Sequence, residues 1–405
     1  MAYARAKDAP WSPLYFLSSL GAGGLAVSFF MYLMWMTPHK GQPIPSFATL
    51  AATFQGGDLV TQSLIAAAGV AILFFSYLHL RILAWNLGEY RTWRKTEVFE
   101  AFAASNAESQ LLAIPLTLAM TVNVLFIVGA VFVPGLWEIA EYLFPAALLA
   151  FAAIGVYALR IFADFIGRVL TAGGFTCQKN NSFGQMLSVF AFAMIGVGFS
   201  ASAAMTHNTV ISAVAIMGTL FFLAAALIMA VIFLVMGFRA MMEHSAEKET
   251  TPTLWVVIPF TTVVGIAIYR VEMALMHNFG VEWEPGSTFL FLATLFAIQL
   301  FFGFVGWTVM RRFGYFEHFV TGDARSPGSF ALICPGVALF VFANFVINPG
   351  LVGIGVVTKF SLAWFALYLP LVVLQAKTIQ VYFRLNAKML KASGGATPAG
   401  MVPAE

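Results

Sequence analysis

The feature that most constrains this chain is a series of ten apolar stretches, each about as long as a membrane is thick. The hydrocarbon core of a bilayer is about 30 Å thick, and a helix rises about 1.5 Å per residue, so a crossing needs about 20 apolar residues. Runs such as AVAIMGTLFFLAAALIMAVIFLVMGF do not alternate apolar and polar residues, as a β-barrel strand would. The sequence therefore predicts an all-α integral membrane protein with ten transmembrane helices, at residues 12–36, 59–83, 111–133, 139–163, 183–206, 209–238, 253–274, 286–310, 329–347 and 353–376.

The composition points to the same class. Of the 405 residues, 60% are apolar and 10% are charged, whereas a soluble domain carries roughly 25% charged residues. A soluble enzyme, a nucleic-acid-binding protein and a disulfide-rich secreted domain are excluded. Cys177 and Cys334 lie far apart without zinc-type spacing, and only His79 comes near the membrane depth that the two axial ligands of a haem would need. We therefore expect no metal and no cofactor.

The basic residues indicate how the chain is oriented in the bilayer. Eighteen of the 21 Lys and Arg residues fall on the side of the N-terminus and of the segments after the even-numbered spans, and only Lys40, Arg270 and Lys359 fall on the other side. The positive-inside rule then places both termini in the cytoplasm. We expect one membrane domain, 1–391, followed by a disordered tail, 392–405. Within the domain, residues 87–108 are expected to form an amphipathic interfacial helix, with a solvated loop as the alternative.

A proline recurs near the start of alternate spans, at Pro13, Pro115, Pro259 and Pro335. The spacing predicts a hairpin of about 75 residues repeated five times, in which proline bends the odd-numbered helices. The odd-numbered spans also carry most of the Gly, Ser, Thr and Asn residues, while the even-numbered spans are nearly uniform in Leu, Ile, Phe and Ala. We therefore predict an inner ring of five odd-numbered helices around a pore-like cavity. The alternative is that the small residues only allow close helix packing.

These features resemble the tellurite-resistance/C4-dicarboxylate transporter family, which includes plant slow anion channels and the bacterial TehA protein. The stretch FLSSLGAGGLA from Phe16 resembles the glycine-spaced first helix of that family. In the family a Phe directly before the proline of the ninth span plugs the pore, and here Cys334 precedes Pro335, so that Phe330 or Phe340 would have to close the path. The resemblance implies a homotrimer, and we expect it in the cytoplasmic membrane of a bacterium.

Residues 173–186, GGFTCQKNNSFGQM, resemble the TsoY group more narrowly. Some members of that group carry selenocysteine where others carry cysteine, and the resemblance places Cys177 at that position. A thiol beside helix N-termini and Lys179 is expected to have thiolate character. Cys177 is therefore a candidate redox residue.

Anion binding is the chemistry that the inner helices favour. Five helix N-termini would face one cytoplasmic vestibule, and free N–H groups at such ends attract anions. Lys179 would add a positive charge there, while Asn180, Asn181 and Ser182 would cap the fifth helix or donate to the anion. On the opposite side, Arg270 and Glu272 would form an interfacial ion pair or, as the alternative, a selectivity element.

Two hypotheses about function follow. The first is a passive anion channel or transporter for a small inorganic or carboxylate anion, because the middles of the spans lack the ionisable relay of a coupled transporter. The second is a membrane thiol-redox protein or sensor that uses Cys177 on a small anionic sulfur compound.

Overall fold

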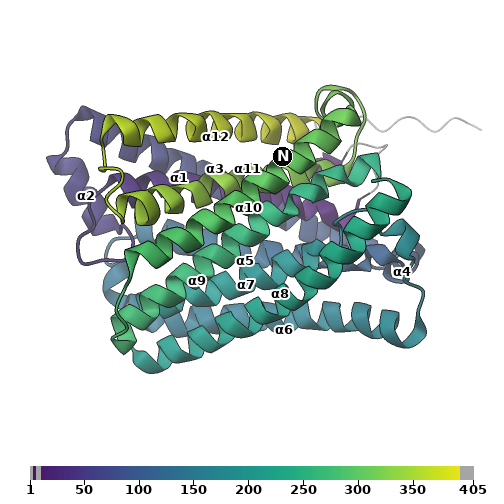
Figure 1. The fold of residues 1–405 in the computed structure, drawn as a ribbon, viewed down its shortest axis with the longest axis horizontal. Helices are drawn as coiled ribbons and strands as arrows, with labels where there is room; N and C mark the ends of the chain where they lie inside the picture. The colour runs from purple at the N-terminus through teal and green to yellow at the C-terminus, as the bar shows by residue number, and fades with distance from the viewer. Residues whose placement is uncertain (1–2, 6–10, 393–405) are drawn as a thin grey trace, which may run out of the picture.

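The computed structural model describes residues 3–5 and 11–392 of the chain, and within them ten helices are long and apolar enough to cross a membrane (Figure 1). The predicted fold class, an all-α integral membrane protein with ten spans, is thereby confirmed. The odd-numbered spans contain α1 (Phe16–Met36), α5 (Ala113–Phe132), α7 (Met186–Met205), α9 (Val257–Phe279) and α11 (Ile333–Phe345). The even-numbered spans contain α3 (Leu59–Trp93), α6 (Ala140–Ala172), α8 (Thr209–His244), α10 (Pro285–Arg312) and α12 (Leu362–Met389).

Short elements connect the spans. The two short α-helices are α2 (Phe47–Gly56) and α4 (Glu97–Ala103), and the two π-helices are η6 (Phe316–Thr321) and η8 (Val346–Val352). Two three-residue strands, β1 (Tyr3–Arg5) and β2 (Leu390–Ala392), pair in antiparallel register, with Tyr3 opposite Ala392. The 3₁₀-helices are η1 (Pro13–Tyr15), η2 (Asn106–Leu112), η3 (Leu136–Ile139), η4 (Cys177–Lys179), η5 (Lys248–Val256) and η7 (Pro327–Leu332).

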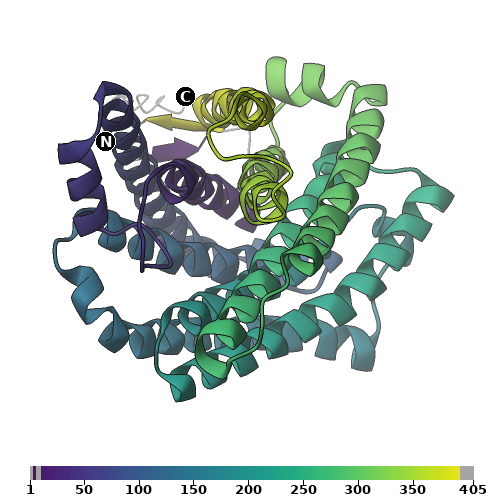
Figure 2. The ribbon, with the colours of Figure 1, turned by 60° about the vertical axis from the view of Figure 1, so that its left-hand side comes forward.

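The five odd-numbered helices form a closed inner ring. Contacts run from α1 to α5, then to α7, α9 and α11, and from α11 back to α1. In the most apolar 18-residue stretch of each odd-numbered span 61% to 94% of the residues are buried, against 17% to 33% in the even-numbered spans. Figure 2 shows α1, in purple, beside the yellow-green α11 and inside the surrounding helices. The composition difference between odd and even spans therefore reflects an inner and an outer position, while the repeat of five hairpins stays a prediction.

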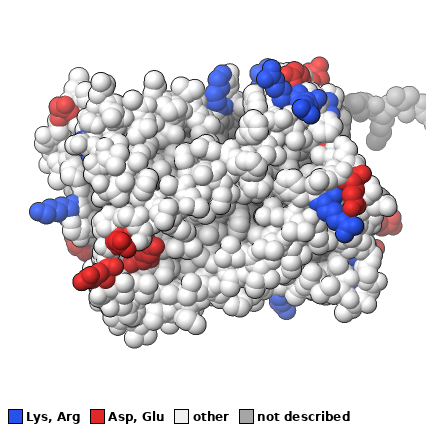
Figure 3. Space-filling model, in the orientation of Figure 1, with Lys and Arg blue, Asp and Glu red and all other residues white. Residues whose placement is uncertain are grey.

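The pairing of β1 with β2 brings the two ends of the described chain together on one side of the molecule. On the face drawn in Figure 3, Lys and Arg gather mainly toward the end at which the inner helices begin. This asymmetry agrees with the charge count in the sequence. The cytoplasmic location of that end stays a prediction.

The last span begins later than predicted. Residues 353–361 were included in it because they are apolar, but they form turns, in which Gly355 and Phe360 have φ values of 76° and 64°. Ser361 then caps α12, because its side chain accepts a hydrogen bond from the backbone N–H of Trp364 at 3.3 Å. Hydropathy alone does not distinguish an apolar turn from the first turn of a helix.

The predicted interfacial helix at 87–108 is not a single helix. Its first part continues α3 as far as Trp93, its middle forms the seven-residue α4, and its end belongs to η2. Thr96 separates the first two, with an extended backbone at the start of α4. The tail predicted to be disordered, 392–405, lies outside the described residues except for Ala392.

The recurring prolines lie near the starts of the inner helices, as the sequence shows, and whether they bend these helices stays a prediction. Pro115, Pro259 and Pro335 are each the third residue of an α-helix, and each of these helices follows a 3₁₀-helix. In the first turn proline removes no hydrogen bond of the α-helix itself, because the N–H groups there have no acceptor within that α-helix. The prolines therefore mark the change from 3₁₀ to α geometry.

Candidate functional site

A cavity of about 170 Å³ lies inside the inner ring. All five inner helices line it, and Phe151 of α6 and Ile44 of the loop after α1 add to its wall. Its lining is mostly aliphatic, aromatic and methionine side chains, which follow from the apolar spans that the sequence shows. Every inner helix contributes side chains to the wall, and examples are Leu20 of α1, Met120 of α5, Phe190 of α7, Thr262 of α9 and Val337 of α11.

Glycine lets the ring close tightly at α1. A Cβ atom added to Gly21, which lines the cavity, would lie 2.7 Å from Cγ2 of the fully buried Ile333 in α11. That separation is much shorter than an ordinary van der Waals contact, so a larger residue would push α1 away from α11. The glycines of FLSSLGAGGLA thus set the diameter of the ring at this level.

Arg270 of α9 gives the cavity its charge. Among the described residues that line the cavity, Arg270 is the only charged one. Its Nη1 donates a hydrogen bond to the backbone oxygen of Val197 in α7, at 3.2 Å. A guanidinium carries five N–H donors, and no other protein acceptor bonds to this one within the described residues. The cavity therefore contains a cation that can still take an acceptor.

The predicted ion pair between Arg270 and Glu272 is absent from the described residues. Glu272 instead accepts a hydrogen bond from Thr288 of α10, at 3.3 Å. Arg270 and Glu272 are two residues apart on α9, so their side chains point in different directions. Only side chains three or four residues apart on a helix are neighbours. The expectation of an interfacial ion pair was therefore wrong, and Arg270 faces the ring without a carboxylate.

Three further polar residues line the cavity, namely Asn123, Ser202 and Thr262. Thr262 of α9 already has its hydrogen bonds, because its hydroxyl donates to Ala338 O at 3.2 Å and accepts from Gln299 Nε2 at 3.0 Å. Asn123 of α5 makes only a 3.8 Å contact from Nδ2 to the sulfur of Met194, and a thioether is a weak acceptor. Asn123 is therefore a second group that can donate to a ligand.

Positive charge from Lys359 lies near the loop after α1, which covers one end of the cavity with Ile44. His39 lies in this loop, and burial lowers its pKa from the usual value. Its contact with the Thr37 carbonyl raises that pKa, while the nearby positive charge of Lys359 lowers it again. The effect of Lys359 on His39 places this lysine close to the same end, where it adds to the attraction for anions.

The structure separates the predicted pore residues into two groups. Pro259 and Cys334 line the cavity, and Cys334 keeps part of its surface accessible. The residues Phe16, Pro115, Phe330, Pro335 and Phe340 are buried outside the cavity wall.

Neither of the predicted plug residues closes the cavity. Phe330 packs on Tyr15, with ring centroids 5.9 Å apart, and Phe340 packs on Tyr32, at 5.6 Å. Phe330 lies in η7 and Phe340 in α11, and neither side chain is part of the cavity wall. The phenylalanines that line the cavity are Phe30, Phe126, Phe151 and Phe190.

The polar segment before α7 does not form an anion site in this structure. Asn181 Nδ2 donates to Ser245 O at 2.9 Å, and Ser182 Oγ accepts from Gly184 N at 3.2 Å. Asn180 is buried, and its backbone N–H donates to Cys177 O at 3.1 Å. None of these three lines the cavity or caps α7 at Gln185, and the side chain of Lys179 lies outside what the structure describes.

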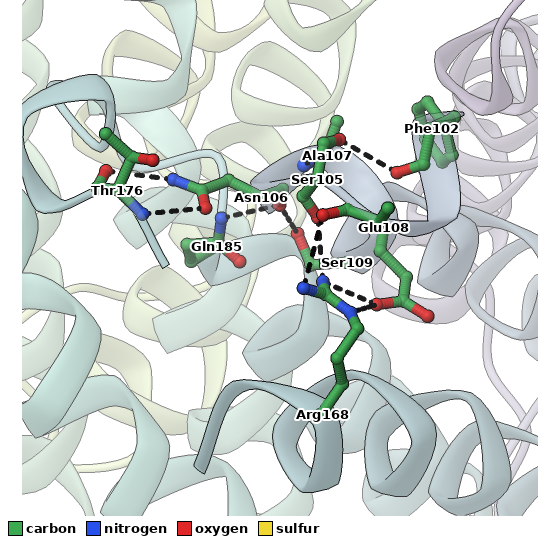
Figure 4. Close-up of polar contacts among 10 residues, drawn as sticks. Phe102, Ser105, Asn106, Ala107, Glu108, Ser109, Arg168, Thr176 and Gln185 are labelled. Carbon is green, nitrogen blue, oxygen red and sulfur yellow. Dashed lines mark hydrogen bonds and ion pairs between the residues drawn. The ribbon is translucent and has the colours of Figure 1, made fainter. Parts of the chain in front are cut away.

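Polar contacts anchor the segment that carries Cys177 (Figure 4). Asn106 of η2 donates to Thr176 O at 3.0 Å and accepts from Thr176 N at 3.2 Å. Nearby, Arg168 of α6 pairs with Glu108 at 2.8 Å, so its charge is already balanced. Cys177 is exposed and does not line the cavity. A thiol reaction at Cys177 would therefore take place outside the cavity.

The N-terminal N–H groups of the inner helices are largely used within the protein. Met186 N, at the start of α7, donates to Phe183 O at 3.0 Å. In the other four inner helices the preceding 3₁₀-helix supplies the acceptor for the first N–H group of the α-helix, so these four groups are not free for an anion. These hydrogen bonds run from Phe16 N to Leu14 O, from Ala113 N to Gln110 O, from Val257 N to Trp255 O and from Ile333 N to Phe330 O.

No protein-family model matches the chain, and a search of curated proteins finds no match. The resemblance to the tellurite-resistance/C4-dicarboxylate transporter family and to the TsoY group therefore stays a proposal. Across the described part of the chain, no group of three His, Cys, Asp or Glu residues is placed to hold a metal ion. Both cysteines are free.

Proposed function

We propose that this membrane protein is a passive channel or transporter for small anions, with its path through the cavity of the inner ring. The observation that supports this proposal is Arg270, a cation without a carboxylate partner in a cavity whose other described lining residues are uncharged and mostly apolar. Ionisable residues at membrane depth are costly and mark ion or substrate paths. An anion beside Arg270 would neutralise that charge.

The sign of the charge selects the ligand. A cation inside the protein repels other cations strongly, because the low dielectric of the interior weakens electrostatic screening. Lys359, near the end covered by Ile44, would attract anions toward the same cavity. These charges favour anions over cations and neutral solutes.

The lining also supports passive movement. Coupled transporters commonly use Asp, Glu or His residues at membrane depth to carry protons. The described residues around this cavity include no residue of these three types. Movement down the anion's own gradient needs no such group.

The closed end of the path would lie where the inner helices begin. Phe16, Ala113, Met186 and Ile333 are all fully buried there. An apolar constriction excludes ions when it is too narrow or too dry for them. Opening would therefore require these first turns to move apart. Of the residues that line the cavity, Cys334 and Pro259 lie nearest that end by position on their helices, as the second residue of α11 and the third of α9.

Modification of Cys334 is expected to block anion flux. N-ethylmaleimide attached to this thiol would fill a large part of the cavity, whereas attachment to Cys177 would leave the cavity open. We expect the reagent to remove most of the chloride flux of the Cys177→Ser variant in liposomes and little of the flux of the Cys334→Ser variant. Each variant is compared with its own untreated flux, and mass spectrometry verifies the modification.

A Cys334→Phe variant fills the same space without a thiol reaction, and it should also lose most of its flux. Wild-type protein that carries no anions above protein-free liposomes would contradict the proposed function. Flux that survives a verified Cys334 adduct and also the Cys334→Phe change would show that the path does not run through this cavity.

A further inference from the structure

The composition of the cavity identifies a class of ligand more narrowly than anions in general, and this inference rests on the proposed function. We propose that the cavity binds a small monovalent organic anion, with a carboxylate-type head at Arg270 and a compact apolar body against the surrounding wall. Charge balance, donor geometry, volume and the chemistry of the lining support this class independently.

Charge balance favours a single negative charge. Arg270 is the only charged residue among the described residues that line the cavity. A dianion such as a dicarboxylate or sulfate would bring a second negative charge without a partner into an apolar space. Leaving a buried charge unpaired is strongly unfavourable. A monoanion would be neutralised completely.

The geometry of the guanidinium favours a planar head with two oxygens. Nη1 of Arg270 already donates to Val197 O at 3.2 Å. The Nε and Nη2 groups, on the other edge of the guanidinium, bond to no protein acceptor within the described residues. Two parallel N–H groups match the two oxygens of a carboxylate. A spherical halide would accept from the same edge with less directional fit.

The volume favours an organic body. A cavity of about 150 Å³ lined by aliphatic and aromatic side chains can hold a benzene molecule, and this cavity measures about 170 Å³. It therefore has room for a ligand of about seven non-hydrogen atoms by the same comparison. A short branched or aromatic monocarboxylate has this size.

The lining favours an apolar body as well. Most of the wall consists of aliphatic, aromatic and methionine side chains, which include Met31, Met120, Met194 and Met205. Methionine side chains are flexible and polarizable, so they adapt to apolar groups of different shapes. A strongly hydrated inorganic anion would lose its hydrating water on entering the cavity and would find few hydrogen-bond donors there, which is unfavourable. Transfer of an apolar group from water to this wall is favourable.

Binding to the purified protein in detergent tests the ligand class without requiring transport. We expect isovalerate to bind about tenfold or more tightly than succinate or sulfate, because the second charge of a dianion would have no partner in the cavity. A tenfold difference in affinity corresponds to only about 1.4 kcal/mol. The neutral analogue isovaleramide is expected to bind weakly. Titration calorimetry measures all four ligands, and the Arg270→Gln variant should lose isovalerate binding while it keeps its thermal unfolding midpoint.

A second variant tests the apolar body. Ala201 lines the cavity, so the Ala201→Phe change should weaken isovalerate binding more than acetate binding, because acetate has only a methyl group to accommodate. The matched control is Ala213→Phe, on the exposed face of α8, which should change neither affinity. If Ala201→Phe lowered the affinities for isovalerate and acetate equally, the proposal that the cavity wall binds the apolar body of the ligand would be wrong.

The outcomes separate the two proposals. Succinate that binds as tightly as isovalerate would overturn the monovalent class. Chloride flux that depends on Arg270, together with no binding of isovalerate, would overturn the organic ligand and leave the proposed function standing. If no anion binds and none is transported, both proposals fail.

Discussion

Replacement of Arg270 by glutamine is expected to lower anion flux about 100-fold or more. A hydrogen bond to a charged partner contributes about 1.5–3 kcal/mol. The loss of two such bonds weakens anion binding by at least about 3 kcal/mol. Because each factor of ten in affinity corresponds to about 1.4 kcal/mol, this loss lowers the affinity of the cavity for the anion about 100-fold or more. Glutamine keeps a polar side chain, which is shorter, and removes the charge. Flux into liposomes measures the change, and the unfolding midpoint verifies that the variant is folded.

Two further variants make this result specific. Arg270→Lys keeps the positive charge but not the two parallel donors, so it should retain more flux than Arg270→Gln. Arg239→Gln is the matched control, because Arg239 is exposed on α8 and pairs there with Glu243 at 2.8 Å. Its flux should equal that of the wild type. Equal flux from Arg270→Gln and Arg239→Gln would remove the main support for an anion path.

Replacement of Gly23 by alanine is expected to destabilise the fold by about 1–3 kcal/mol, the usual cost of overpacking a core. A Cβ atom at Gly23 would lie 2.6 Å from Cγ of Met120 and 2.9 Å from Nδ1 of His79. Something must move to admit it. Thermal unfolding in detergent, followed by circular dichroism, should show a lower midpoint than the wild type.

His79 makes this site sensitive because it connects three helices. Its Nδ1 lies 2.8 Å from Ser19 O in α1, and its Nε2 lies 2.8 Å from Thr121 Oγ1 in α5. The ring is fully buried, so displacement would leave polar groups unsatisfied at a cost of about 1–3 kcal/mol each. The contacts of Gly23 therefore affect hydrogen bonds as well as packing.

The control for Gly23 is Gly88 of α3, because an added Cβ there would meet no atom within 4 Å. Alanine is favoured over glycine in a helix by about 1 kcal/mol. Gly88→Ala should therefore leave the unfolding midpoint unchanged or raise it. A Gly23→Ala midpoint equal to that of Gly88→Ala would show that α1 is not packed as closely as the structure places it.

The number of spans and their inner or outer position could be predicted because both depend on composition along the chain. Membrane thickness sets the length of an apolar run, and a buried inner helix tolerates Gly, Ser and Thr where a lipid-facing one carries larger apolar side chains. The start of the last span could not be predicted, because the apolar turn at 353–361 has the hydropathy of a helix. Local backbone geometry decides such a boundary.

The candidate site was predicted less completely than the fold. The sequence identified Arg270 as one of three basic residues away from the main basic side. Its interaction partner could not be predicted, because that depends on the direction of its side chain. Glu272, the expected partner, contacts Thr288 instead. For the same reason the sequence did not show that Phe330 and Phe340, the candidates for closing the path, lie outside the cavity wall. Which face of a helix points to the axis depends on the packing of all five inner helices.

The most direct measurement is the location of bromide in crystals of the protein, found by its anomalous scattering. Bromide is a monovalent anion, so it tests anion binding independently of the proposed carboxylate ligand. We predict a bromide peak inside the inner ring, within hydrogen-bond distance of Arg270, that disappears in the Arg270→Gln variant. Bromide found only outside the ring, with Arg270 paired to Glu272, would contradict an anion site in the central cavity.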